Sequence, residues 1–334
     1  MLLRDILDGK DRQVAAVVSV LRSADADAVV LASIDHDRHA HALNALADLI
    51  GDYPHRFSAP SNRGLAPDID RDGDGWPGEA EDAQGHAAFR GQGGLAILSR
   101  FPIDRGAVED FSSHLWRSLP EHTAPDLAAP DQRLSTTAHW TVPLLLPGGD
   151  RLTLATWHAT PPVFDGPEDM NGRRNHDEAA FWLHWLDGAF GVSPDRFVIA
   201  AAANLDVVDG DGRPSALLRL LSHENVTDPE PRSHGGVQAA AAQGGVNDTQ
   251  NGDPALDTAD WSDDPRRPGN LRVDYVLPSS AFAVTASGVL WPTDDTSLRR
   301  DVLDASRHRL VWVDLCAKGD ADCLAGVSRP KPGE

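Results

Sequence analysis

The sequence contains few cysteines and no long apolar run. Cys316 and Cys323 are the only cysteines in 334 residues, which excludes a disulfide-rich scaffold. They are close enough along the chain to form a disulfide or to remain free thiols, and the sequence leaves both alternatives open. No segment reaches the roughly 20 apolar residues that span a bilayer, so no membrane span is expected.

An export signal is also missing from the sequence as it stands. The first residues, MLLRDILDGKDRQ, turn polar at once, unlike the apolar core of a signal peptide. The compartment therefore stays unknown: periplasmic or extracellular if an upstream signal peptide exists, and cytoplasmic otherwise.

Positive charge is scarce. Lys and Arg number 30 against 51 Asp and Glu, which gives a formal net charge of −21 at pH 7. Such a field repels phosphate backbones, so non-specific nucleic-acid binding is not expected. The same field favours the binding of cations.

Short apolar segments alternate with amphipathic ones along the chain. Continuous apolar runs predict strands near residues 28–32, 95–98, 152–157, 197–201, 273–277 and 310–315. Helical spacing predicts helices near 11–22, 41–50, 177–186 and 216–221, and Gly/Pro/Asp-rich loops are expected over 58–93, 109–130 and 229–270. The order favours an α/β (α+β) chain with mixed sheets: a single domain over 1–316 and a C-terminal tail over 317–334.

Five segments in order resemble the endonuclease/exonuclease/phosphatase family of metal-dependent phosphoesterases, most of all a bacterial branch. They are GGLAILSRFPI (93–103), TWHATPPVFDGPEDMNGRRNHDE (156–178), FVIAAAANLD (197–206), LRVDYVLPS (271–279) and SRHRLVWVDL (306–315). The resemblance implies a four-layer sandwich of two packed mixed β-sheets flanked by helices. The strand that comes first in the family would precede Met1.

The same resemblance assigns the expected catalytic positions. Active members use a divalent metal, typically magnesium, at the strand ends, together with a histidine–aspartate pair that activates water. Four positions match the family residues: His158, Asn204, Asp274 and His308. Three positions where the family has carboxylates differ, with Ser33, Ala202 and Arg307 in their place.

These replacements change the expected chemistry of the site. Relative to the family pattern, the local charge goes from −3 to +1, so Mg²⁺ at the family site is not expected. The sequence therefore predicts a pseudoenzyme that has lost metal-dependent phosphoester hydrolysis and acts as a binding or assembly module. Arg307, His308 and His158 would form a donor-rich site for an anion.

Two other functions remain open. One is an active phosphodiesterase or phosphatase with an altered metal site, in which Asp35, Asp37 or Asp206 replaces the lost ligands. The other is a structural subunit of a larger complex. The expected partner is accordingly a protein or a small anionic ligand.

A separate acidic loop matches the calcium pattern D-x-D-x-D-G-x5-E. Its ligands would be Asp70, Asp72, Asp74 and Glu81, with Gly75 at the sharp turn; a second register runs from Asp68 to Glu79. A structural Ca²⁺ is expected here, since so many acids would otherwise repel one another. The alternative is a solvated acidic turn, and the acidic loop over 206–211 is a weaker calcium candidate. The loop over 161–178 is interpreted mainly as architecture.

Overall fold

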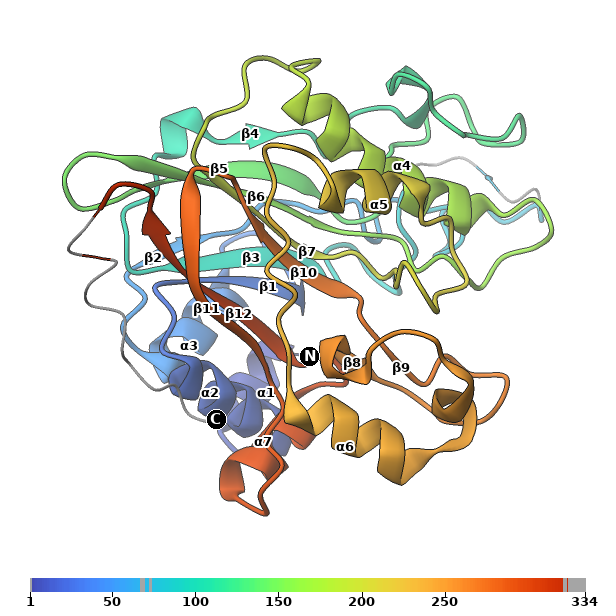
Figure 1. Ribbon diagram of the computed structural model, residues 1–334. Coiled ribbons are helices and arrows are strands. Elements are labelled where there is room, and N and C mark those ends of the chain that lie inside the picture. The colour runs from blue at the N-terminus through green and yellow to red at the C-terminus, as the bar shows by residue number, and fades with distance from the viewer. Residues whose placement is uncertain (1, 67–69, 72–73, 321–322, 324–334) are drawn as a thin grey trace.

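The computed structural model describes residues 2–66, 70–71, 74–320 and 323 (Figure 1). A five-stranded sheet has the order β10-β7-β6-β5-β4 and a three-stranded sheet the order β1-β3-β2. Strands β11 and β12 form a separate antiparallel pair, as do the short strands β8 and β9. The expectation of a mixed α/β chain with several sheets is confirmed.

The strands and helices have the following bounds. The strands are β1 (Ala28–Ile34), β2 (His55–Phe57), β3 (Gly94–Ser99), β4 (Glu109–Asp110), β5 (His139–Leu145), β6 (Arg151–His158), β7 (Phe197–Ala202), β8 (Ala259–Asp260), β9 (Asn270–Leu271), β10 (Asp274–Pro278), β11 (Phe282–Leu290) and β12 (Leu310–Ala317). The α-helices are α1 (Leu2–Asp8), α2 (Arg12–Ala24), α3 (His41–Ile50), α4 (Met170–Leu186), α5 (Ser215–Leu221), α6 (His234–Gln243) and α7 (Ser297–Ala305).

The three largest apolar clusters hold the two larger sheets and their helices together. Helices α4 and α5 pack on one face of the five-stranded sheet, where Trp182 and Leu217 meet Ile199. The other face of that sheet packs against the three-stranded sheet, through residues such as Val198 and Ile97. Helices α1 to α3 cover the outer face of the three-stranded sheet. Strand β7 is buried on both faces, which explains why its sequence, FVIAAA, is apolar throughout.

The segment over 229–270 differs from the expected long loop. It contains α6, whose sequence HGGVQAAAAQ includes four consecutive alanines, the residue with the highest helix propensity. Ser233 caps this helix by accepting a hydrogen bond from the amide of Gly236. Two 3₁₀ turns, η3 (Gly245–Thr249) and η4 (Pro254–Leu256), follow in the same segment. The apolar pattern here is too weak to predict these elements from sequence.

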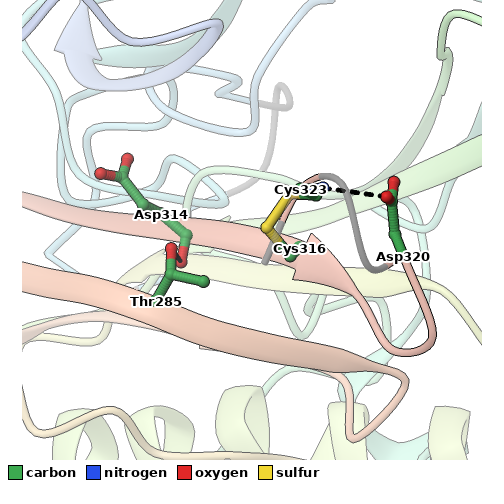
Figure 2. Close-up of a disulfide and its surroundings, with 5 residues drawn as sticks. All are labelled: Thr285, Asp314, Cys316, Asp320 and Cys323. Atoms are coloured by element: carbon green, nitrogen blue, oxygen red, sulfur yellow. Dashed lines mark hydrogen bonds between the residues drawn. A yellow bond between two sulfur atoms is a disulfide. The ribbon is translucent and has the colours of Figure 1, made fainter. Parts of the chain in front are cut away.

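Cys316 and Cys323 form a disulfide at the end of β12 (Figure 2). Cys316 is buried at the edge of the β11–β12 pair, and the amide of Cys323 donates to Asp320 at 3.0 Å. The disulfide thus attaches the chain after β12 to that strand. Within the described residues, no helix is long and apolar enough to cross a membrane.

Candidate functional site

The ends of three neighbouring strands bring the site together. Ala202 ends β7 and lies in register with His158 on β6, the parallel neighbour, and with Asp274 on β10, the antiparallel neighbour. Residues in register across a sheet project from the same face. Side chains alternate along a strand, so Val198 lies on the same face of β7 as Ala202. Val198 packs with residues of the three-stranded sheet, and this face is therefore turned toward that sheet. The methyl group of Ala202 therefore lies between an imidazole and a carboxylate.

His308 and Asp274 form a histidine–aspartate pair. Nδ1 of His308 lies 2.8 Å from Oδ2 of Asp274, and the hydroxyl of Thr258 donates to the same oxygen at 3.0 Å. The negative charge of Asp274 raises the pKa of His308 above its ordinary value, although burial opposes this shift. The ring of Trp261 packs edge-on against His308, with 5.4 Å between the ring centroids. The pair has the geometry of a histidine oriented by an aspartate.

His158 has the opposite electrostatic environment. Its side chain is buried, and burial lowers its pKa to about 3, helped by the nearby positive charges of Arg63 and His308. Its Nδ1 has no hydrogen-bond partner among the described residues. His158 is therefore a neutral imidazole at physiological pH, with one ring nitrogen unused.

Arg63 is a site residue that sequence reasoning missed. It lies in the loop after β2, where its Nε donates to the carbonyl of Gln92 at 3.1 Å. Burial lowers the pKa of Arg63, while Asp35 opposes the shift. No motif marks Arg63, since its closeness to His158 comes from the folding of a long loop.

Asn204 also lies at this end of the sheet. Its backbone is left-handed, with a φ of 52°. Its side-chain amide donates to the carbonyl of Ala159 at 2.7 Å, which ties the segment after β7 to the end of β6. Asn175 on α4 reinforces the same junction by donating to the carbonyls of Thr160 and Ala203. Both amides hold the strand ends in place.

Ser33 and Arg307 supply no carboxylate. Ser33 lies at the irregularity where β1 shifts its pairing with β3, has a φ of 62° and is exposed. Arg307 is exposed too, and its side chain makes no hydrogen bond or ion pair within the part of the chain that is described. Mg²⁺ requires hard oxygen ligands, and a hydroxyl, a methyl and a guanidinium are a poor match. In the described ranges, no three His, Cys, Asp or Glu side chains group so as to hold a metal.

The candidate substitute ligands already hold backbone groups. Asp35 accepts a hydrogen bond from the amide of Gly93, and Asp37 accepts from three amides at the start of α3. Asp206 accepts from the amides of Val208 and Asp209 with Oδ1 and from that of Arg272 with Oδ2. These bonds give each carboxylate a role in positioning a loop.

The acidic loop is described in part. Asp68 and Asp72 lie outside the described residues. Asp70 accepts from the amide of Gly75 at 2.8 Å, and Gly75 has a φ of 95°, as the sharp turn requires. Asp74 accepts from the amide of Trp76 at 2.8 Å, and Glu81 lies 3.7 Å from His86. Calcium binding by this loop stays a prediction.

The similarity to known proteins extends over most of the chain. The model of the endonuclease/exonuclease/phosphatase family matches residues 7–308. An endonuclease/exonuclease/phosphatase from Beutenbergia cavernae is similar in structure, with a TM-score of 0.53 and 18% identity over 92% of this chain. This chain covers 66% of that protein, and so spans slightly less than two thirds of its length.

Two further solved structures are similar over nearly their whole length. A family protein from Bacteroides thetaiotaomicron has a TM-score of 0.48 and 13% identity, covering 93% of this chain and 92% of its own. Truncated TDP2 from Caenorhabditis elegans has a TM-score of 0.47 and 14% identity, covering 92% and 90%. No curated protein matches the sequence. The match of the family model over most of the sequence shows that the chain belongs to the endonuclease/exonuclease/phosphatase family.

Proposed function

We propose that this chain is a phosphoesterase-like protein that does not hydrolyse phosphoesters through a metal. It binds a small anion, such as phosphate or a carboxylate, at the strand ends and acts as a binding module. One observation carries the proposal: Ala202, in register between His158 and Asp274, presents a methyl group where the family resemblance implies a metal-binding carboxylate.

Electrostatics supports the loss of the magnesium site. Two unit charges about 4 Å apart interact by about 4 kcal/mol at an effective dielectric constant near 20. Replacing three carboxylates by Ser33, Ala202 and Arg307 removes attractive interactions of this size and adds a repulsive one. The loss of the carboxylate at Ala202 alone would then weaken Mg²⁺ binding roughly a thousandfold, because each 1.4 kcal/mol is about a factor of ten.

The remaining groups favour an anion. Arg307 is exposed, and its guanidinium can donate two parallel hydrogen bonds to a phosphate or carboxylate. The raised pKa of His308 increases the fraction of this histidine that is positively charged near neutral pH. Arg63 adds a positive charge close to His158. Arg63 and His308 are thus the positive charges that act on His158, whereas Arg307 is assigned to this site by the family resemblance alone.

The test has an activity arm and a binding arm. The unmodified protein should show no hydrolysis of a generic phosphodiester above background with Mg²⁺ or Mn²⁺. Calorimetric titration with inorganic phosphate should detect binding, and Arg307→Ala should weaken it about tenfold or more, as expected for a charged hydrogen bond of about 1.5–3 kcal/mol. Arg219→Ala, an exposed arginine on α5, is the matched control and should bind like the unmodified protein.

Either arm can contradict the proposal. Mg²⁺-dependent hydrolysis that disappears in His308→Ala would show an active enzyme with an altered metal site, for which Asp35, Asp37 and Asp206 remain the candidate ligands. Phosphate binding that is absent, or equal in Arg307→Ala and Arg219→Ala, would contradict the anion site. A protein that co-purifies stoichiometrically without phosphate binding would favour the structural-subunit function instead.

A further inference from the structure

Asp257 is a buried acid close to other acids. Its side chain is 6% exposed, and its Oδ2 has no hydrogen-bond partner among the residues described. Burial raises its pKa to about 8, and the negative charges of Asp206, Asp209 and Asp253 raise it in the same direction. An orphaned carboxyl of this kind is rare in native proteins and calls for an explanation.

The charged groups that raise the pKa of Asp257 are three other acids. Asp206 and Asp209 come from the loop after β7 and hold the amides of Arg272 and Gly252. Asp253 lies at the start of η4. Arg232 binds Asp253, and Arg272, whose amide Asp206 holds, binds Asp228 through two hydrogen bonds.

The residue after Asp257 connects this acid to the functional site. The hydroxyl oxygen of Thr258 accepts from the amides of Val273 and Asp274, each at 3.0 Å, and donates to Oδ2 of Asp274. The carbonyl of Thr258 accepts from the amide of Arg309 at 2.6 Å. Thr258 therefore fixes Asp274 and also the backbone beside His308.

The next two residues extend this connection. Ala259 forms an antiparallel bridge with His308, and the amide of Asp260 donates to the carbonyl of Arg307 at 3.0 Å. The segment over 257–260 thus contacts both members of the histidine–aspartate pair. Any loosening of this segment would disturb their alignment.

We propose that the segment over 257–260 is a proton-dependent catch for the His308–Asp274 pair. It stays docked while Asp257 is uncharged and opens when Asp257 ionises, because the ionised carboxylate must reach water and leave its acidic neighbours. The catch regulates the site of the proposed function. The opening of the segment does not depend on the proposed function. Only its effect on anion binding rests on that function.

The sign of the pH dependence follows from proton linkage. The carboxyl of Asp257 ionises near pH 8 in the closed segment, and near its ordinary value of about 3.9 once the segment is open. Between these values the closed form holds one proton more than the open form, so rising pH favours opening. The opening equilibrium should increase about tenfold per pH unit up to about pH 8 and be level above it.

Hydrogen exchange measures this opening without any ligand. The amides of Val273, Asp274 and Arg309 are bonded to Thr258, so their protection reports the docked segment. After correction for intrinsic exchange, their protection in the unmodified protein should fall about tenfold per pH unit from pH 5.5 to 7.5. In Asp257→Asn the protection should fall much less than tenfold per pH unit, because only the titration of His308 then remains to change it, whereas the exposed-acid control Asp195→Asn should behave like the unmodified protein.

The outcomes separate the catch from the proposed function. Protection that does not change with pH in the unmodified protein would overturn the catch, and this measurement needs no variant to fold. An equal slope in Asp257→Asn would overturn the role of this acid. If the slope is present and phosphate binding is absent, the catch stands and the anion site fails.

Discussion

At the residue scale, the pair formed by His308 and Asp274 sets the protonation of the site. A histidine whose pKa is raised in the folded state stabilises the fold below its unfolded value and loses that contribution as pH rises through the raised value. The stabilisation from this pair is therefore greatest in mildly acidic solution. Anion binding through His308 should weaken over the same pH range, because the imidazole loses its positive charge.

The substitution Asp274→Asn tests this assignment. It removes the charge that raises the pKa of His308, while leaving an amide of the same shape to accept from Thr258. The pKa of His308 should fall, because only burial then shifts it. Titration of the histidine ring protons by NMR measures the change, with His308→Ala identifying the signal. A pKa that is the same in Asp274→Asn would show that another group controls His308.

The sequence could predict some of these residues and not others. His158, Asp274 and His308 belong to segments with a recognisable pattern, and the structure brings His158 and Asp274 into register on either side of Ala202. Arg63 and Asp257 carry no such pattern. Their positions depend on how long loops fold over the strand ends, and no local propensity or spacing encodes that packing.

At the element scale, the regular strands follow from the sequence and the loop segments do not. The apolar run over 197–201 becomes β7, because a strand buried on both faces must be apolar throughout. Helix α4 begins at Met170, several residues before the expected start, since its first turns bury polar residues such as Arg174. Arg174 donates to the carbonyls of Leu134 and Ser135. Because these first turns bury polar side chains through hydrogen bonds, they do not show the apolar spacing that predicts a helix.

We propose that the acidic loop over 70–81 binds a structural Ca²⁺. The segment from Asp68 to Asp82, both included, contains seven acids, and their mutual repulsion favours a bound cation. Chelation should lower the melting temperature and added Ca²⁺ should restore it, because a ligand that binds only the folded state stabilises it. Scanning calorimetry measures the shift, and Asp70→Ala with Asp72→Ala should remove the response. Identical melting curves with and without chelator would rule out the ion.

At the scale of the whole molecule, we propose that three side chains decide whether the strand ends bind a cation or an anion. The variant Ser33→Glu, Ala202→Asp and Arg307→Asp should bind Mg²⁺ at the strand ends and lose phosphate binding, since it changes the local charge by four units. The single variants should do little, because groups that act as a unit do not contribute independently. Calorimetric titration with MgCl₂ and with phosphate measures both effects. A triple variant that folds and still prefers phosphate would contradict the assignment of these positions.

The methyl group of Ala202 has a consequence for how the protein tolerates its surroundings. A cluster of like charges lowers the stability of the folded state, and enzymes retain such clusters because catalysis requires them. In this chain the backbone register of β6, β7 and β10 forms without that strain. Under the proposed function, the strand ends need no ion to fold, and this part of the molecule does not have to balance stability against activity as a metalloenzyme does.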